Sequence, residues 1–314
     1  MNKFQSILNI KLTTLIICFL PISIVLGNLI LNLNIFILIC LYLLEKFEHS
    51  NLKLFIIKKN ILLLLITLFF SFNLIESINW KFTLKGQLGL IKHILLYFAL
   101  IHFFLKDDKN FKLLINVFVF VLIFVLVDSY IQFIFGKDLF GYVATDHHGR
   151  RLSGPFGDEY VVGSFILKTI FITKYHKYFD NQINWLIYLL LAFVLVILAS
   201  QRMPTLIFSI SLIILFFFEY RINVKKKIFT FLASLICIVL IFNFNPSVKK
   251  HYIDRTLEQI GYSDQAKLKN FWDSQWGAHY LTAIEIYKNN PIFGTGIKTF
   301  RFVCAKDRYK KIES

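Results

Sequence analysis

The chain has 314 residues, of which 57% are hydrophobic and 17% aromatic, with 36 phenylalanines among them. This apolar content, with a mean hydropathy of +0.63, exceeds the roughly 45–50% of soluble domains and excludes an ordinary soluble globular protein. The formal net charge of +16 would suit nucleic acid, but the basic residues form short clusters between apolar runs. We therefore expect an all-α polytopic membrane protein that lies in a lipid bilayer and binds no nucleic acid.

Nine apolar segments of spanning or near-spanning length follow one another along the chain. The sixth of them is short and contains Lys168, so a tilted or interfacial helix is its alternative. No small-x-small cleavage site follows the first segment, which we interpret as an uncleaved helix. The nine segments are Leu12–Leu26, Leu29–Leu44, Asn60–Ile75, Leu88–Leu105, Phe111–Phe135, Val161–Thr173, Ile183–Ala199, Pro204–Phe218 and Ile228–Phe244.

The basic residues of the connecting loops predict the orientation. With a cytoplasmic N-terminus, fifteen lysines and arginines fall on the cytoplasmic side. The opposite short loops receive six: Lys81, Lys85, Lys137, Arg150, Arg151 and Arg202. By the positive-inside rule the N-terminus is cytoplasmic, and a multi-pass protein of the bacterial inner membrane with a periplasmic active face is expected.

This orientation divides the chain into two predicted domains. Residues 1–244 form a transmembrane helix bundle, with the polar outer loop at 136–160. Residues 245–314 form an outer, periplasmic region of about seventy residues, long enough to carry structure of its own. The turn at Ser200–Pro204 falls on the same outer face.

The outer loop Gly136–Tyr160 concentrates the groups that can do chemistry. Two planar guanidinium forks suit bidentate contact with phosphate oxygens, although a solvated basic turn has the same composition. Two adjacent acids before the sixth segment fit either a helix start or a catalytic carboxylate. Adjacent histidines with no further ligands at zinc spacing make a poor metal site, so we expect no metal. These candidates are Arg150, Arg151, Asp158, Glu159, His147 and His148.

Arg202 is the sharpest single candidate. It stands between the apolar runs AFVLVILAS and MPTLIFSIS. A charge within the membrane costs roughly 2.5–3.5 kcal/mol at mid-depth on insertion scales and is usually kept for function. An interfacial arginine that extends to lipid headgroups is the plain alternative.

Further polar groups interrupt the apolar segments themselves. Lys92 and His93 lie in the fourth segment, and Asp128 and Gln132 in the outer half of the fifth. Ionisable groups at such depth are functional candidates by default. Lys92 and Asp128 equally fit a structural ion pair between helices, and the sequence does not choose.

The terminal region contains an amphipathic helix candidate at Lys267–Lys288, rich in aromatic residues and suited to the membrane surface. On it, His279 is either a packed histidine or an outer-face base. The run Gly294-Thr295-Gly296 is weak as a phosphate loop because no helix clearly follows it. Cys304 stands without an evident partner in a segment predicted to lie outside the cytoplasm, whereas Cys18, Cys40 and Cys237 lie in apolar runs.

Three stretches together resemble the O-antigen ligase and polymerase superfamily of bacterial envelope proteins. They are RLSGPFGDEYVVGSF, then SQRMPT at the start of a span, then TAIEIYKNNPIFGTGIKTFRFVC. In motif order and hydropathy the resemblance runs from about Leu90 onward. Arg202 matches the family's arginine in a small-residue-x-Arg turn that enters a helix.

The resemblance implies an inverting glycosyl transfer that needs no metal or other cofactor. The donor would be an undecaprenyl-pyrophosphate-linked saccharide, and the acceptor a lipid A–core sugar for ligases or another lipid-linked repeat for polymerases. Such chemistry needs positive charge at the leaving pyrophosphate, which predicts Arg202, Arg151 and Arg150 as its contacts, and a base for the acceptor hydroxyl, for which His279 and Glu159 are the candidates.

The sequence departs from the family at its end. Members carry an HPHN-like histidine motif later in the outer loop and further membrane helices, whereas this chain stops at Ser314. We therefore expect a C-terminally truncated product, and a non-catalytic remnant is one alternative. Members also often carry an arginine ahead of the proline-GxG segment, where this chain offers His279 or, further back, Arg255. A transporter of lipid-linked saccharide is the alternative from another class, although no internal repeat favours it.

Overall fold

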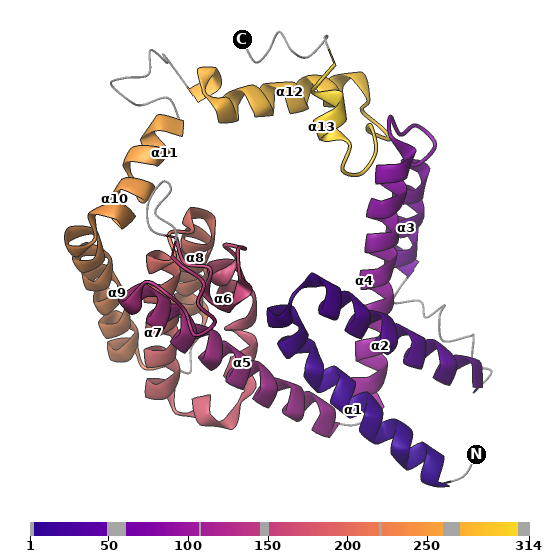
Figure 1. Cartoon of the computed structure of the whole chain (residues 1–314), viewed down its shortest axis with the longest axis horizontal. Coiled ribbons are helices and arrows are strands. Elements are labelled where there is room, and N and C mark those ends of the chain that lie inside the picture. Colours follow the sequence, from indigo (N-terminus) through magenta and orange to yellow (C-terminus); the bar gives the residue numbers. More distant parts are fainter. Residues whose placement is uncertain are drawn as a thin grey trace. The chain divides into compact units, whose positions relative to one another are not determined.

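The computed structural model describes residues 3–48, 61–106, 108–144, 151–219, 222–259 and 271–306 (Figure 1). Among these residues, four helices contain a stretch long and apolar enough to cross a membrane: α2 (Asn28–Glu48), α4 (Trp80–Lys106), α5 (Asp108–Phe135) and α9 (Val224–Phe244). Three shorter apolar stretches lie in α1 (Lys3–Leu26), α7 (Gln182–Leu198) and α8 (Arg202–Phe218). The all-α membrane class is thereby confirmed, while the total of nine spans and their orientation stay predictions.

The segment Val161–Thr173 does not form one spanning helix. Its helix, α6 (Val162–Thr169), has eight residues and rises only about 12 Å, against a hydrocarbon core of about 30 Å. The chain then turns through the short helices η4 (Ile172–Tyr175) and η5 (Lys177–Asp180). The segment is apolar because α6 packs on α5, α7 and α8, with Ile166 and Ile170 fully buried, and not because it faces lipid.

The third predicted span is also short in the structure. Helix α3 (Ile61–Phe72) has 12 residues, and Asn60, at which we expected the span to begin, lies outside the described residues. At 1.5 Å per residue α3 rises about 18 Å.

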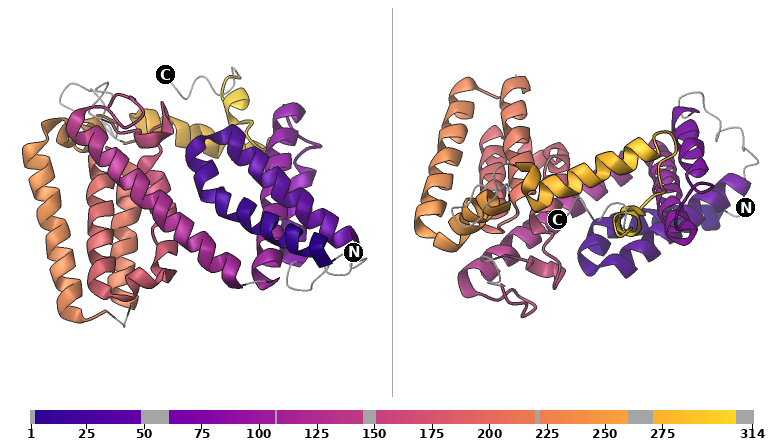
Figure 2. Two further views of the ribbon diagram at one scale, coloured as in Figure 1. Left: turned by 60° about the horizontal axis from the view of Figure 1, so that its bottom comes forward. Right: turned by 90° about the horizontal axis from the view of Figure 1, so that it is seen from above.

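The helices form two compact units, Met1–Asn34 with Lys106–Arg255, and Ile35–Leu105 with Thr256–Ser314. These two units are defined by contacts between helices. The predicted domains, 1–244 and 245–314, are defined by membrane topology and stay a prediction. In the first unit α1 packs along α5, and α7 contacts α5, α6, α8 and α9. Figure 2 shows α7, α8 and α9 running side by side. The core of this unit lies around α7, where Leu189, Ala192 and Val196 are fully buried.

Two short helices follow α9 along the chain. Pro246 occupies the first position of α10 (Pro246–Tyr252), where its missing N–H is no loss. Helix α10 packs against α9, and α11 (Asp254–Gln259) comes directly after it. The chain that leaves α9 therefore stays on the first unit as far as Arg255.

The second unit includes α3, α4, α12 (Gln275–Asn289) and α13 (Phe300–Val303). The Gln87 side chain of α4 donates to the Phe70 carbonyl of α3 at 2.6 Å. Near the other end of α4, His102 Nε2 lies 3.1 Å from Glu45 Oε2, and the His102 ring packs edge-on against Tyr42. These polar contacts join α2, α3 and α4 within the unit.

Candidate functional site

Arg151 and Arg255, from separate segments of the first unit, lie within electrostatic range of Arg202. Arg151 belongs to the loop after α5, Arg202 is the first residue of α8, and Arg255 lies in α11. The charges of Arg255 and Arg151 both act on the Arg202 guanidinium, and all three residues are half-buried. Three like charges in a partly desolvated region repel one another, and a bound anion would relieve that repulsion. We refer to Arg151, Arg202 and Arg255 as the arginine cluster.

A buried glutamine holds the loop that carries Arg151. Gln132 of α5 is fully buried, and its Oε1 accepts hydrogen bonds from the backbone N–H groups of Ser153 at 3.0 Å and Gly154 at 2.8 Å. Its Nε2 donates to Ser153 Oγ at 3.1 Å and to the Tyr142 carbonyl at 3.2 Å. Gly154 has a φ of +53°, and a Cβ there would overlap Ser129 Oγ, so the close approach requires glycine. The polar residue that the sequence places in the fifth span thus anchors the outer loop.

Asp128 plays a similar role, about one turn earlier in α5. Its Oδ1 accepts from the Leu139 backbone N–H at 3.0 Å, and it is fully buried. In the loop, Asp138 Oδ1 accepts from the N–H groups of Phe140 at 3.0 Å and Tyr142 at 2.6 Å. These bonds shape the start of the outer loop. The Lys92–Asp128 pair considered from the sequence stays untested, because Lys92 belongs to the other unit.

The turn before Arg202 is strained and rich in buried donors. Ser200 has a φ of +55°, in the left-handed region that residues other than glycine rarely adopt, and it is fully buried. Gln201 is 5% exposed, and its Oε1 accepts from the Ser164 N–H at 3.3 Å. Within the described part of the chain, Ser200 Oγ, Gln201 Nε2 and Arg151 Nε are buried without a hydrogen-bond partner. Buried donors of this kind are rare in native proteins unless a ligand or water satisfies them.

Tyr252 joins α10 to the beginning of α8. Its hydroxyl lies 2.7 Å from Thr205 Oγ1 and donates to the Ile197 carbonyl at 3.3 Å. Burial raises the pKa of Tyr252 to about 12, so the phenol is neutral at physiological pH and serves as a hydrogen-bonding group. Its contact with α8 fixes the end of α10, and Arg255 follows three residues later.

The acidic pair of the loop lies at the surface. Asp158 and Glu159 are exposed, and the N-cap position of α6 is Val161, with no side-chain hydrogen bond, so neither acid caps the helix. The next residue, Tyr160, stacks its ring against the Arg151 guanidinium at 4.5 Å. The Asn28 amide lies 3.5 Å from Glu159 Oε1. Glu159 is thus adjacent in the chain to a residue that contacts the arginine cluster.

Three predicted candidates have no described position. His147, His148 and Arg150 lie outside the described residues. Their sequence neighbour Arg151 is described, and it is the last residue before the turn Leu152–Gly154 that Gln132 holds.

His279 lies on the exposed surface of α12 in the second unit, with its ring near those of Trp276 and Phe300. The helix begins later than the predicted Lys267–Lys288, because Ser274 Oγ accepts from the Gly277 N–H at 3.1 Å and caps it. Residues 260–270 lie outside the described ranges. The structure therefore brings Arg151 and Arg202 together and leaves His279 on a separate unit.

The segment PIFGTGIKTF packs against α4 of its own unit. Gly296 has a φ of +106°, and a Cβ there would overlap the hydroxyls of Ser77 and Thr83. The Thr295 carbonyl accepts from the Ile78 N–H at 3.2 Å, and Ile297 lies so close to Gly86 that any larger residue would collide with it. Gly296 and Gly86 thus permit the close approach of the two segments, which gives the second glycine of the GTG run a packing role.

Residues 187–313 match the family model described as O-antigen ligase. This region of the chain belongs to the O-antigen ligase family. The match contains Arg202, Arg255 and His279, and the resemblance stated from the sequence motifs is thereby confirmed. The family supports a membrane enzyme of the O-antigen ligase or polymerase kind with glycosyltransferase-like activity, whose partners are a lipid-linked saccharide and an acceptor. No curated protein and no solved structure shows a significant match.

Three residues of the matched family region lie around Arg202 but were not predicted as site residues from the sequence. They are Gln201, Tyr252 and Arg255. The sequence analysis names Arg255 only as a residue far ahead of the proline-GxG segment and contains Gln201 only as part of the motif SQRMPT, and nothing in the motifs marks Tyr252. Gln201 offered a usable signal, because it is a polar residue directly between two predicted spans, whereas Tyr252 and Arg255 follow the last predicted span by eight and eleven residues.

Proposed function

We propose that this O-antigen ligase family chain is a membrane glycosyltransferase of the ligase type in lipopolysaccharide biosynthesis. It would transfer a saccharide from an undecaprenyl-pyrophosphate carrier to a hydroxyl of a lipid A–core or similar acceptor. The observation that supports this proposal is the arginine cluster, with Arg151, Arg202 and Arg255 in one region. Guanidinium forks match phosphate oxygens in geometry and charge, and a pyrophosphate carries enough negative charge to engage several of them.

The arginine cluster would act on the leaving group. As the bond from the anomeric carbon to the pyrophosphate oxygen breaks, negative charge grows on that oxygen. Fixed positive charges stabilise this transition state more than the ground state. Arg202 and Arg151 are the proposed pyrophosphate contacts, joined by Arg255, and Arg150 is proposed as a further contact from its place next to Arg151 in the sequence.

A base must take the proton from the acceptor hydroxyl as its oxygen bonds to the anomeric carbon. Glu159 is our first candidate, because the adjacent Tyr160 stacks on Arg151 and its carboxyl group is exposed to an incoming acceptor. His279 is the second candidate, since it is exposed and lies within the matched family region. The proton moves to the base, and the lipid pyrophosphate leaves with the electron pair of the broken bond.

We place this reaction at the periplasmic face of the bacterial inner membrane. The three segments that carry the arginine cluster are those that the positive-inside rule puts on the outer side. The charges of Arg151 and Arg255 act on Arg202, as we expect of residues on one side of the membrane. The lysines that begin α9 lie at the far end of the preceding hairpin, on the predicted cytoplasmic side.

Restoration of surface polysaccharide in a bacterial strain without its own ligase tests the proposal. The wild-type chain is expected to restore it, and Arg202→Ala and Arg255→Ala to reduce transfer at least about 100-fold, the usual loss for one stabilising donor. Lys250→Ala, which removes an exposed positive charge from α10, is the matched control and should retain full activity. Membrane levels of every variant are compared by immunoblot.

The outcomes separate the possible functions. Full restoration by Arg202→Ala would remove the arginine cluster from the mechanism. Restoration only in a strain that lacks the polymerase would assign the chain to the polymerase branch of the family. No restoration in either strain, with normal membrane levels, would contradict the proposed transferase activity.

A further inference from the structure

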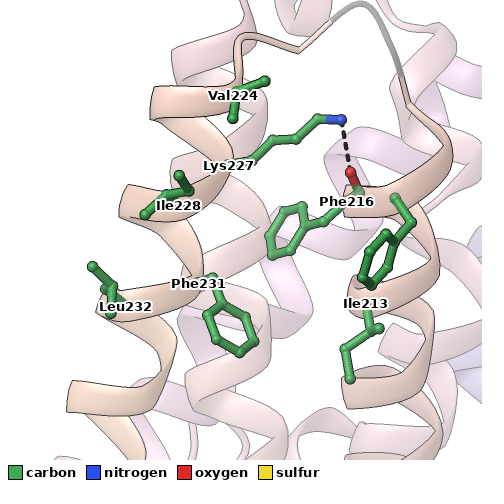
Figure 3. A pocket seen from close by; sticks show the side chains of 8 residues that line it. Ile213, Phe216, Val224, Lys227, Ile228, Phe231 and Leu232 are labelled. Atoms are coloured by element: carbon green, nitrogen blue, oxygen red, sulfur yellow. Dashed lines mark hydrogen bonds between the residues drawn. The ribbon is translucent and has the colours of Figure 1, made fainter.

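An apolar groove lies between the C-terminal half of α8 and the beginning of α9 (Figure 3). Its volume is about 410 Å³, and Ile213, Phe216, Phe231 and Leu232 are among the seven apolar side chains that line it. Lys227 is the one charged residue of the lining. Ile213 comes eleven residues after Arg202, about 16 Å along α8, so the groove is separate from the arginine cluster.

The packing of α9 explains why the groove is open. Helix α9 packs against α7 and α10, so its face toward α8 keeps exposed apolar side chains. Phe217 on α8 is 81% exposed, and Val224 and Ile228 on α9 are 65% and 55% exposed. Apolar side chains without neighbours lose their dispersion contacts, so inside a bilayer lipid hydrocarbon packs against such a surface. The body of the groove therefore suits an acyl chain.

The end of the groove nearest the α8–α9 turn is positively charged. Lys227 reaches across it, and its Nζ donates to the Phe216 carbonyl at 2.7 Å, one of three hydrogen bonds that an ammonium group can donate (Figure 3). Lys225 and Lys226 precede it in the first turn of α9, and Lys226 Nζ lies 3.1 Å from Gln182 Oε1. Glu219 contributes the only acid between α8 and this lysine run. The excess of lysines over acidic residues at this end favours the binding of an anion.

We propose that this groove binds an anionic glycerophospholipid of the cytoplasmic leaflet. One acyl chain lies along the seam between α8 and α9, and the phosphate lies at Lys227 with Lys225 and Lys226 beside it. From Val224 to Leu232 the seam extends about 12 Å along α9, a depth suited to the upper part of an acyl chain. Anionic lipids are enriched where lysine clusters meet the cytoplasmic surface, which matches the predicted orientation. The site is independent of the glycosyl transfer proposed above.

Photo-crosslinking of the full chain in phosphatidylcholine vesicles tests the proposal. The probe is a phosphatidylglycerol with a photoactivatable group in its acyl chain, and the comparison is a phosphatidylcholine with the same chain. Mass spectrometry of the crosslinked peptides should place the phosphatidylglycerol on the α8 and α9 segments several-fold more often than the comparison lipid. Unlabelled phosphatidylglycerol should displace the probe, and unlabelled phosphatidylcholine should not.

Two variants test the lysines that would bind the phosphate and the apolar groove that would bind the acyl chain separately. Lys225→Gln, Lys226→Gln and Lys227→Gln together should lower the labelling several-fold, and Leu232→Trp should lower it by filling the groove without a change of charge. Lys249→Gln with Lys250→Gln, which removes two exposed lysines of α10, is the matched control. Equal labelling by both lipids, labelling confined to other helices, or crosslinks from the groove to a second copy of the chain would each overturn the proposal. Should a variant fail to insert, the competition between unlabelled lipids on the wild-type chain decides alone.

Discussion

Replacement of Gln132 by leucine should release the loop that carries Arg151. Gln132 is fully buried in α5, where its side chain accepts from the backbone N–H groups of Ser153 and Gly154. Leucine has a similar size but no hydrogen-bonding atom, so both N–H groups would remain buried without a partner. The loop can recover those hydrogen bonds only by opening to water, and that opening moves Arg151 away from Arg202 and Arg255.

The magnitude follows from these two amide groups. A buried donor that loses its partner costs about 1–3 kcal/mol, so the two together lower the free energy of local opening by about 2–6 kcal/mol. Since about 1.4 kcal/mol corresponds to a tenfold change in an equilibrium constant, protection of these amides should fall by about 30-fold to about 10⁴-fold. Helices elsewhere in the unit should keep their protection, because the lost bonds are local.

Hydrogen exchange of the Ser153 and Gly154 amides in the purified membrane protein is the assay. Gln132→Glu is the matched control, because a buried carboxyl group in its neutral form keeps the carbonyl that accepts from both N–H groups and an O–H donor in place of Nε2. We expect most of the protection to survive in that variant. Equal protection in Gln132→Leu and the wild type would refute this account of how the loop is held.

Two further predictions concern stability. Gly296→Ala should lower the free energy of unfolding by at least about 1–2 kcal/mol, because the φ of +106° disfavours a side chain and its Cβ would overlap the Thr83 hydroxyl. Thermal unfolding measures the loss, and Gly89→Ala, whose Cβ enters open space on α4, should cause none. Tyr252 favours its neutral form in the fold, because burial raises its pKa to about 12. Its stabilisation is therefore complete below the ordinary value of about 10 and is lost as the pH rises through about 12. Phenolate absorbance in the wild type minus that of Tyr252→Phe measures this titration, and a midpoint near 10 would contradict it.

The sequence predicted the helical class because long apolar runs in a chain of this composition leave few other structures. It failed at Val161–Thr173, since an apolar segment buried among helices and one that faces lipid have the same hydropathy. It also misplaced the start of α12, because the capping bond from Ser274 to Gly277 outweighed the amphipathic pattern that precedes it.

The site could be predicted only partially. Arg202 stood out because a charge beside a span is costly and rare, and Arg151 because adjacent guanidinium groups suit bidentate contact with phosphate oxygens. Arg255 could not be selected in the same way, since its approach depends on α10 turning back from α9 and on the contact of Tyr252 with Thr205. The GTG run could have been interpreted as a ligand-binding loop, whereas in the structure its second glycine, Gly296, packs closely against Ser77 and Thr83. The proximity of Arg255 to Arg202 depends on how α10 packs, and the spacing of residues along the chain does not contain that information.

Binding of undecaprenyl pyrophosphate to the purified full chain tests the central claim most directly. We expect saturable binding by the wild type, at least about tenfold weaker binding by Arg202→Ala and by Arg151→Ala, and no change in Lys250→Ala, since each lost charge-assisted pair weakens binding by about 1.5–3 kcal/mol. The salt dependence of binding should be smaller in the two arginine variants than in the wild type. Unchanged affinity in both arginine variants would contradict the assignment of the arginine cluster to the lipid-linked pyrophosphate.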